Sequence, residues 1–593
     1  MVRRSSLLHF LFDLLCADLA LGSNLLGRAS TSPVQDEYDF VVVGGGTAGM
    51  VLANRLTESS NTTVLVIEDG SQPTIIKGCT ARLRRNLKSI GNPPLSLQTA
   101  LNGRMIDYNR ERCLGGSSTI NGALYIRGSS SLFDQWENLG DPGWNWESVL
   151  PYFIKGTTSG PTYKTLHAAY DFSAYCNGTG FLSVSYSPHL YSSTSAWVEA
   201  VSDIGISYVK DLKTGLSAGA TRIIFTVKDG KRASAYDAYY INFGGMPGSL
   251  TATGVTYTDL NLGMTMNVTA RKEVIISAEA VQTPQLLMLS LRIGKLGLIQ
   301  GVGPASQLNG QGIESYLLKA SMYKFTIVRV QTSEAQSLSF NNIANLQAAQ
   351  MLYSTNQSGP LSASSQPGIG FERLNSSELE TLGANELVIT NRSDQRHVIY
   401  FQGTTAYPNI LVGGIPLLIN QSCMSLTSVS VAPLSRGNIT LQSVSITDPP
   451  LIDPGYLTNA ADITITRRQF GKVREILASP GFADITVGPN NGEKSFPVLA
   501  CPRKKRMLST SKRSPVHSSL RYKLAVWLDY HPCGTCRMLP ESSGGVVDSR
   551  LNVYGMNDLR IVDASIFPLI PDGSIQVNGH RYLRSQESPS APD

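Results

Sequence analysis

The sequence lacks the paired cysteine and histidine spacings of a metal site, so we predict none. It contains 8 cysteines and 7 histidines, and the one close pair, Cys533 and Cys536, forms a C-x-x-C that we interpret as part of a C-terminal motif rather than a redox dithiol. One disulfide is compatible with the other cysteines of the mature chain, and their spacing does not select the pair. Those cysteines are Cys79, Cys113, Cys176, Cys423 and Cys501.

Long apolar runs are also scarce, and the one candidate lies at the N-terminus. Arg3 and Arg4 precede a mostly apolar stretch over residues 7–21, which is typical of a secretory signal peptide spanning residues 1–23. This stretch is too short and too acidic for a stable membrane span. Glycosylation sequons support a secreted or vesicular/vacuolar glycoprotein, although we expect Asn267 to be buried. The sequons begin at Asn61, Asn177, Asn267, Asn356, Asn375, Asn391, Asn420 and Asn438.

Charged residues are sparse, at 16% of the chain against 42% apolar residues. This balance suits a globular protein, and 593 residues are enough for two or more domains. The net charge is +6, but much of the excess lies in residues 503–523 without the aromatic interleaving of a nucleic-acid surface. We interpret that segment as a solvated loop and predict no nucleic-acid partner.

Residues 38–70 have the pattern of a strand, a glycine turn, a helix and a second strand. Gly44, Gly46 and Gly49 form G-x-G-x-x-G directly after an apolar β-branched run. The first glycine allows the tight turn, the second lets backbone approach a pyrophosphate, and the third lets the helix pack on the sheet. Glu68 ends the second strand, near the position of a carboxylate that bonds a ribose hydroxyl. The pattern predicts a dinucleotide site, does not separate FAD from NAD, and leaves a structural turn with incidental glycines as the simpler alternative.

Other stretches of the sequence predict further elements of this domain. A Gly-Gly-Ser-Ser turn at residues 115–118 is either a second ligand-binding loop or an ordinary turn. We expect two strands at 263–270 and 273–277, a helix beginning near Pro284, and a buried strand at 559–563.

Three tryptophans in residues 132–153 are expected in the core. Polar segments with β-branched stretches over 180–265, together with the long polar region 325–430, indicate an antiparallel substrate domain. The predicted fold class is therefore α/β, a Rossmann-like domain with a second, antiparallel-sheet α+β substrate domain.

These blocks together resemble the glucose–methanol–choline (GMC) oxidoreductases, within which the chain is most similar to fungal aryl-alcohol oxidases and enzymes of polyketide pathways. The resemblance rests on GGSSTINGALYIRG, on SAEAVQTPQLLMLS followed by GVGPASQL, and on HPCGTCRM with VDASIFPLIP. It implies FAD as the cofactor. The cofactor-binding residues that it implies are Gly44, Gly46, Thr47, Ala48, Gly49 and Asp563 with Ala564 near the pyrophosphate, Glu68 and Asp69 at the ribose, Val268 by the adenine, and Asn121, Gly122, Ala123, Leu124, Ile575 and Gln576 near the flavin.

The resemblance also implies oxidation of a primary alcohol, a class that includes aromatic and benzylic alcohols, to an aldehyde in fungal secondary metabolism. His531 matches the catalytic histidine, and a neutral imidazole accepts the hydroxyl proton near pH 7 while the flavin accepts the hydride. Ser574 stands where a second histidine or asparagine is usual. The implied partners are a small-molecule alcohol and oxygen or a quinone as electron acceptor, and the oligomeric state stays open.

The implied organisation is an interleaved one. We predict FAD-binding segments over residues 36–185, 263–320 and 525–580, and substrate-domain segments over residues 186–262 and 321–485.

The chain also departs from the family pattern. Glu279 replaces a small residue, an insertion interrupts residues 290–301, and the end of the chain after Gln576 is polar. These departures leave two alternatives to alcohol oxidation, namely a non-redox cyclase or synthase on the same fold and an inactive product of a damaged gene.

Overall fold

The structure is a computed structural model. It describes residues 37–58, 61–70, 90–91, 110–159, 178–209, 214–215, 218–240, 252–259, 264–293, 313–317, 322–329, 343–364, 366–389, 395–404, 423–443, 445–483, 485, 526–528 and 531–579. The predicted signal peptide, the basic segment and the insertion after Ser290 lie outside the described side chains.

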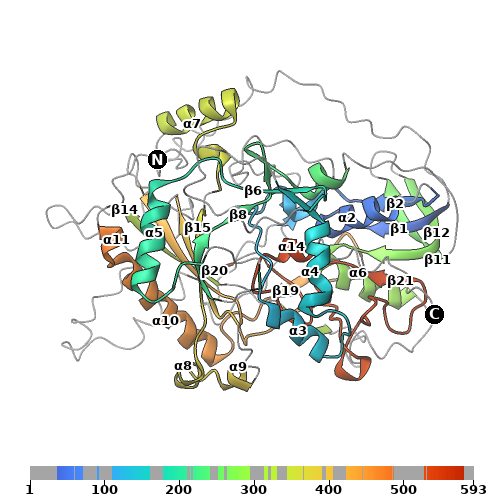
Figure 1. Cartoon of the computed structure of the whole chain (residues 1–593). Helices are drawn as coiled ribbons and strands as arrows, with labels where there is room; N and C mark the ends of the chain where they lie inside the picture. The colour runs from blue at the N-terminus through green and yellow to red at the C-terminus, as the bar shows by residue number, and fades with distance from the viewer. Residues whose placement is uncertain are drawn as a thin grey trace, which may run out of the picture. The chain divides into compact units, whose positions relative to one another are not determined.

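A five-stranded sheet contains the first glycine motif. Its central strand, β1 (Glu37–Val43), runs parallel to β2 (Val64–Ile67) on one side and to β12 (Met264–Ile276) on the other. The far side of β12 pairs with β11 (Ala252–Asp259) in antiparallel fashion and with β21 (Leu559–Ile561) in parallel (Figure 1).

The register brings the carboxyl ends of the parallel strands to one edge. Val43 lies opposite both Ile67 and Ile276, and Ile276 lies opposite Ile561. Since ligands of open α/β sheets bind at the carboxyl ends of the strands, this edge is where the site is expected.

Both faces of the sheet are apolar, as the β-branched run at its centre predicted. Val42 packs in the cluster that includes the helix α2 (Thr47–Leu56), whereas Val41, together with Val268, belongs to a separate cluster on the other face. Successive strand residues point to opposite faces, so a strand buried on both faces reads as a continuous apolar run.

Two predictions about this region were wrong. The two strands expected at 263–270 and 273–277 form the single strand β12, because its two halves continue one ladder beside β1. The helix expected to begin near Pro284 is α6 (Glu279–Ile293), with the proline inside it. The helix begins earlier because the hydroxyl of Thr283 accepts a hydrogen bond from the amide of Ala278 and thus closes the first turn.

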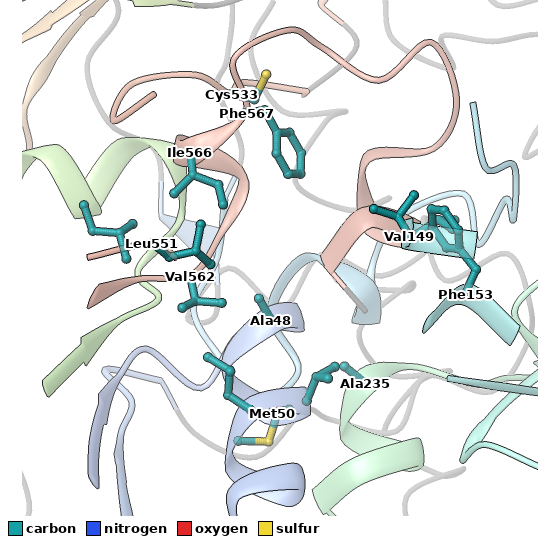
Figure 2. Close-up of a cluster of buried hydrophobic side chains, with 14 of the residues drawn as sticks. Ala48, Met50, Val149, Phe153, Ala235, Cys533, Leu551, Val562, Ile566 and Phe567 are labelled. Carbon is teal, nitrogen blue, oxygen red and sulfur yellow. The ribbon is translucent and has the colours of Figure 1, made fainter. Parts of the chain in front are cut away.

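The tryptophan-rich segment forms two helices, α3 (Ser130–Asn138) and α4 (Trp146–Lys155). Trp136 and Trp144 are buried in the same cluster as Val42. Figure 2 shows part of this cluster, in which Val149 and Phe153 of α4 are drawn with Ala48 and Met50 of α2.

A second sheet has six strands, all paired antiparallel, in the order β20-β14-β17-β16-β15-β7. This confirms the prediction of a second, antiparallel sheet, and its role in substrate binding stays a prediction. Its strands are β20 (Val526–Leu528), β14 (Met322–Arg329), β17 (Cys423–Ser430), β16 (Val398–Gly403), β15 (Gly368–Glu372) and β7 (Gly219–Arg222).

Alternate residues of this sheet belong to different clusters. Val398 and Tyr400 pack with the helices α5 (Ser192–Asp203) and α10 (Ala460–Leu477). Ile399 and Phe401 of the same strand belong to a cluster that also contains Ile126 and Leu124. The substrate sheet therefore lines the loop in which the flavin-side residues were predicted.

The remaining elements are short. They are β3 (Ile90–Gly91), β4 (Arg110–Glu111), η3 (Gly116–Thr119), β5 (Thr157–Ser159), β6 (Leu182–Tyr186), β8 (Ile224–Phe225), β9 (Val227–Lys228), β10 (Lys231–Arg232), η5 (Tyr236–Tyr240), β13 (Ile313–Leu317), α7 (Ile343–Asn356), η7 (Pro360–Ser362), α8 (Ser376–Thr381), α9 (Asn385–Ile389), β18 (Gly437–Thr440), β19 (Leu451–Asp453), α11 (Pro480–Ala483), η9 (Glu541–Ser543), η10 (Ala564–Ile566) and α14 (Ile575–Gly579). Within the described residues, no helix is both long and apolar enough to span a membrane.

Candidate active site

The turn between β1 and α2 forms one wall of the candidate site, and its three glycines differ in what surrounds them. Gly44 has φ +107°, and a Cβ there would lie 2.3 Å from the carbonyl oxygen of Ser277. A Cβ on Gly49 would lie 2.0 Å from the carbonyl oxygen of Gly44. A Cβ on Gly46, in contrast, would meet no atom within 4 Å. The first and third glycines are therefore required by packing, whereas the second borders open space.

The first turn of α2 faces this space without a protein cap. Gly46 is the N-cap residue, no side chain caps the helix, and its first turn contains no acidic residue. Unpaired amides at a helix N-terminus attract phosphate. Thr47 and Ala48 open the helix, so their amides belong to this anion-binding end. These features fit a dinucleotide pyrophosphate.

The Gly-Gly-Ser-Ser turn packs backbone to backbone against the first glycine turn. Gly115 has φ +88° and donates its amide hydrogen to the carbonyl oxygen of Gly45, with 2.8 Å between the atoms. Thr47 Oγ1 donates to the carbonyl oxygen of Gly115 at 3.3 Å. A Cβ on Gly116 would lie 2.9 Å from the Cα of Gly46. Of the two interpretations of this turn, its position beside the first glycine motif favours the ligand-binding one.

Glu68 lies at the end of β2 and is fixed by two backbone amides. Its Oε2 accepts from Gly45 at 2.8 Å and its Oε1 accepts from Gly70 at 3.0 Å. Burial raises the pKa of the Glu68 carboxyl, while these two hydrogen bonds act in the opposite direction. Asp69 beside it is exposed and pairs with Arg112. Glu68 thus has a fixed orientation next to the glycine turn, as its predicted contact with a ribose hydroxyl requires. For the exposed Asp69 the structure gives no comparable support.

Asp563 lies after β21, at the same edge of the sheet. Its Oδ2 accepts from Thr283 Oγ1 at 2.6 Å, and its Oδ1 accepts from the amide of Ser565 at 2.8 Å. Burial raises the pKa of the Asp563 carboxyl, and the bonds from Ser565 and Thr283 oppose that shift. The carboxylate therefore caps η10, whose first residue is Ala564.

The segment that follows His531 is attached to this same cap. The amide of Gly534 donates to the carbonyl oxygen of Ala564 at 3.1 Å, that of Cys536 to Ser565 at 2.8 Å, and that of Met538 to Ile566 at 2.8 Å. His531 is half-buried and lies three residues before Gly534, the first residue that makes one of these bonds.

The two cysteines of the C-x-x-C pack into the core. Neither cysteine forms a disulfide, both are buried, and burial raises the pKa of Cys536. Figure 2 shows Cys533 near Phe567 in the cluster that also contains Ile566 and Val562. This supports the interpretation of the cysteines as part of a structural motif. Cys113, one of the disulfide candidates, is also free.

The predicted flavin-side residues come together across the chain. Asn121 Nδ2 donates to Gln576 Oε1, and Gln576 Nε2 donates to the carbonyl oxygen of Leu124 at 2.7 Å. Ala123 has φ +59°, and its amide donates to Asn121 Oδ1 at 2.8 Å. The backbone of Gly122 accepts a hydrogen bond from Ser364 at 3.4 Å. Residues 121–124 and α14 therefore form one hydrogen-bonded unit.

Ser574 and Ile575 lead into α14. The amide of Ser574 donates to the carbonyl oxygen of Ile126 at 2.8 Å, which places the serine beside the flavin-side loop. The neighbouring Asp572, which is 2% exposed, accepts from the amide of Ser129 at 2.8 Å and from its hydroxyl at 2.7 Å. The backbone around Ser574 is therefore fixed on both sides.

Val268 lies farther down the sheet, on β12 opposite Val255. Its side chain is buried in the apolar cluster with Val41, and its proposed place by the adenine stays a prediction. The expected burial of the adjacent Asn267 was wrong, because successive strand residues point to opposite sides and this asparagine is exposed.

Two residues near the site were not predicted from the sequence. Arg232, on the hairpin strand β10, donates to Asn121 Oδ1 at 2.7 Å and to the Asn121 carbonyl oxygen at 2.6 Å. No local signal identifies it, because the contact joins distant segments. Arg110 forms an ion pair with Glu279. The unusual glutamate was the available signal for that pair.

Comparison with known proteins agrees with this geometry. A family model described as GMC oxidoreductase matches residues 38–242, and a second with the same description matches residues 433–578. Dehydrogenase pkfF of Emericella nidulans is 31% identical, covering 91% of this chain and 90% of that protein. Versicolorin B synthase of Aspergillus parasiticus is 28% identical, covering 90% of this chain and 85% of that protein.

Solved structures have the same fold. A formate oxidase of Aspergillus oryzae RIB40, studied for its FAD modification, aligns with a TM-score of 0.78 at 23% identity, covering 93% of this chain and 98% of its own. A fungal aryl-alcohol oxidase aligns with a TM-score of 0.73 at 21% identity, with the same coverage. The glycine cradle and uncapped helix fit the FAD of this fold. The chain therefore belongs to the GMC oxidoreductase family, whose members are FAD-dependent oxidoreductases acting on CH–OH groups.

Proposed function

We propose that this chain oxidises a primary aromatic alcohol to an aldehyde in fungal secondary metabolism, with His531 as the base. The observation that carries the proposal is the attachment of the His531 segment to residues 564–566 by three backbone hydrogen bonds. It anchors the chain three residues after His531 beside the end of β21, at the edge of the sheet where the cofactor cradle lies, and this supports His531 as the base. The likeness to a fungal aryl-alcohol oxidase supports the substrate class.

The proposed roles follow from the chemistry of the side chains. Neutral His531 takes the hydroxyl proton, because an imidazole is an effective base near pH 7. Ser574 donates a hydrogen bond to the substrate oxygen and orients it, since a serine hydroxyl is no base at this pH. Bound FAD supplies the hydride acceptor. Oxygen or a quinone then serves as the final electron acceptor.

An apolar substrate is consistent with the wall next to the flavin-side loop. Ile399 and Phe401 of the substrate sheet pack in one cluster with Leu124 and Ile126. A substrate pocket bordered by this apolar cluster would favour an aromatic ring over a small polar alcohol, because burial of the ring's apolar surface is favourable.

The test is an anaerobic spectral titration of purified holoenzyme with benzyl alcohol. We expect the flavin absorbance to bleach with stoichiometric formation of benzaldehyde. His531→Gln should slow bleaching by a factor of about 10²–10⁴ while FAD stays bound, and Ser574→Ala by roughly tenfold or less. A flavin that no primary alcohol reduces would refute the proposal.

A second candidate is a synthase reaction without net oxidation. It is favoured by Ser574 at a position usually filled by histidine or asparagine, and by the likeness to a versicolorin B synthase. Product formation without flavin bleaching would support this candidate. Stoichiometric peroxide or reduced quinone would remove it. A colourless protein that melts without cooperativity would instead indicate an inactive product.

We also propose that the protein enters the secretory pathway and is glycosylated. The basic and apolar N-terminal pattern supports this, and among the sequons Asn61, Asn267, Asn356 and Asn375 are exposed. Mass analysis of the protein secreted by a fungal host should show loss of residues 1–23 and a mass decrease on deglycosylation. An intact N-terminus on an unglycosylated protein would contradict it.

A further inference from the structure

Glu279 occupies a backbone conformation that favours glycine. It has φ +67°, lies three residues after Ile276, the last residue of β12, and is the first residue of α6. Glycine adopts this left-handed region readily because it has no Cβ. Among the other residues only asparagine and aspartate adopt it often, because Cβ crowds the backbone. A strained residue kept in place indicates that its side chain does something that glycine could not.

The Glu279 side chain uses both carboxylate oxygens. Ser117 Oγ donates to its Oε1 at 2.6 Å. Arg110 Nη1 lies 3.5 Å from its Oε2, and the Arg110 side chain is only 8% exposed. A buried guanidinium needs an anionic partner, and Glu279 is one that Arg110 has here.

These contacts lie at the cofactor cradle. Ser117 directly follows Gly116, at which a Cβ would lie 3.3 Å from the amide nitrogen of Thr47 in the first turn of α2. The negative charge of Glu279 also acts on two carboxyl groups beside the cradle. It adds to burial in raising the pKa of Glu68 and of Asp563. The carboxylate is therefore within electrostatic reach of the pyrophosphate-binding end of α2.

We propose that Glu279 acts as an internal competitor for the phosphates of FAD. Its carboxylate holds Ser117 and Arg110, a hydroxyl and a cation of the kind that a pyrophosphate would bind, and it brings a negative charge toward that anion. This chain consequently binds FAD more weakly than the same cradle would without the charge. The inference rests on FAD as the cofactor, and it is independent of the alcohol and of His531.

The alternative is a purely structural role, in which Glu279 holds Arg110 and Ser117 so that the cradle keeps its shape. The two roles predict opposite signs. If Glu279 competes, neutralising it tightens FAD binding, whereas if it supports the cradle, neutralising it weakens binding.

The test measures FAD affinity of the full-length apoprotein by flavin fluorescence and by calorimetry, without any alcohol. Glu279→Gln removes the charge and retains the size of the side chain. We expect its Kd for FAD to fall roughly tenfold relative to wild type. Glu279→Gly should show at least the same gain.

Glu273→Gln is the matched control. Glu273 lies on β12, the strand that leads to α6, and pairs with Arg560 at 2.7 Å; its side-chain exposure of 20% is similar to the 26% of Glu279. It lies opposite Phe40, in the middle of β1 and away from the carboxyl edge. Its replacement should leave the Kd for FAD unchanged.

A double-mutant cycle with Arg110→Gln identifies the competed group. We expect this substitution to raise the Kd for FAD more in the Glu279→Gln background than in wild type, because only the freed arginine reaches the phosphates. An unchanged or higher Kd in Glu279→Gln, in a protein that melts as cooperatively as wild type, would overturn the proposal. If every variant, Glu273→Gln included, failed to bind FAD, the cofactor assignment itself would fall.

Discussion

Two neighbouring strands of one sheet each turn into a helix at the same edge, and they do so with different residues. After β1, the left-handed position is Gly44, and the turn is held by backbone contacts to Ile67 and Ser277. After β12, the left-handed position is Glu279, and the turn is held by side chains, with Thr283 bonded to both Ala278 and Asp563.

The difference shows how space is divided between a ligand and the protein. The first turn is built of glycines, which have no side chains, and it leaves open space at Gly46. The second turn fills its surroundings with polar side chains that reach Ser117 and Asp563. The first turn therefore leaves space for a bound anion, whereas the second turn is occupied by contacts within the protein.

The largest effect should come from a methyl group in the first turn. Gly44→Ala should lower the free energy of unfolding by about 4 kcal/mol or more, because its Cβ would lie 2.3 Å from the Ser277 carbonyl oxygen at φ +107°. Gly555→Ala is the control, since Gly555 has φ +73° but open surroundings, and it should cost about 1 kcal/mol. Urea unfolding compares them, and equal losses would mean that the tight contact contributes nothing.

A smaller loss is expected when the second turn loses its hydroxyl. Thr283→Val should cost about 2–3 kcal/mol, because the buried Asp563 loses a hydrogen-bond donor. Thr283 favours the charged carboxylate, whose folded pKa already lies above its usual value. The difference from wild type should therefore be smallest below pH ~4 and should widen as the pH rises through the folded pKa. Melting curves across this range check the sign, and a pH-independent difference would contradict the assignment.

Glycine should suit the second turn as it suits the first. Glu279→Gly should be about 1 kcal/mol more stable than Glu279→Gln, because both lose the charge but only glycine relieves the positive φ. Thermal melts of the two apoproteins provide the comparison. Equal stability would show that the strain at this position is negligible.

The smallest change in stability is expected at Gly46. Gly46→Ala should alter the free energy of unfolding by about 0.5 kcal/mol or less, because its Cβ would meet nothing within 4 Å, yet it should weaken FAD binding tenfold or more. Gly471→Ala, also in open surroundings, should leave FAD binding unchanged. Unaltered affinity in Gly46→Ala would mean that the cradle does not hold the pyrophosphate.

The first turn was predictable because its signals are adjacent in sequence. The apolar run, the three glycines and Glu68 lie within one strand-turn-helix-strand unit, and the geometry follows their spacing. The start of the helix after the second turn was predicted wrongly, because its position depends on two side-chain hydrogen bonds. Thr283 accepts one from the amide of Ala278 and donates one to Asp563. Arg232 was missed because a side-chain contact between distant segments leaves no local pattern, and the only signal for Arg110 was its unusual partner, Glu279.

The bond between Asn121 and Gln576 joins residues 455 positions apart. A ribosome adds about 5–20 residues per second, so the flavin-side loop waits tens of seconds for the partner that completes it. The first glycine turn can form early, whereas the flavin-side unit is complete only after Gln576 has been synthesised. A transcript that ends before the codon for Gln576 would leave most of the fold encoded and its cofactor pocket open.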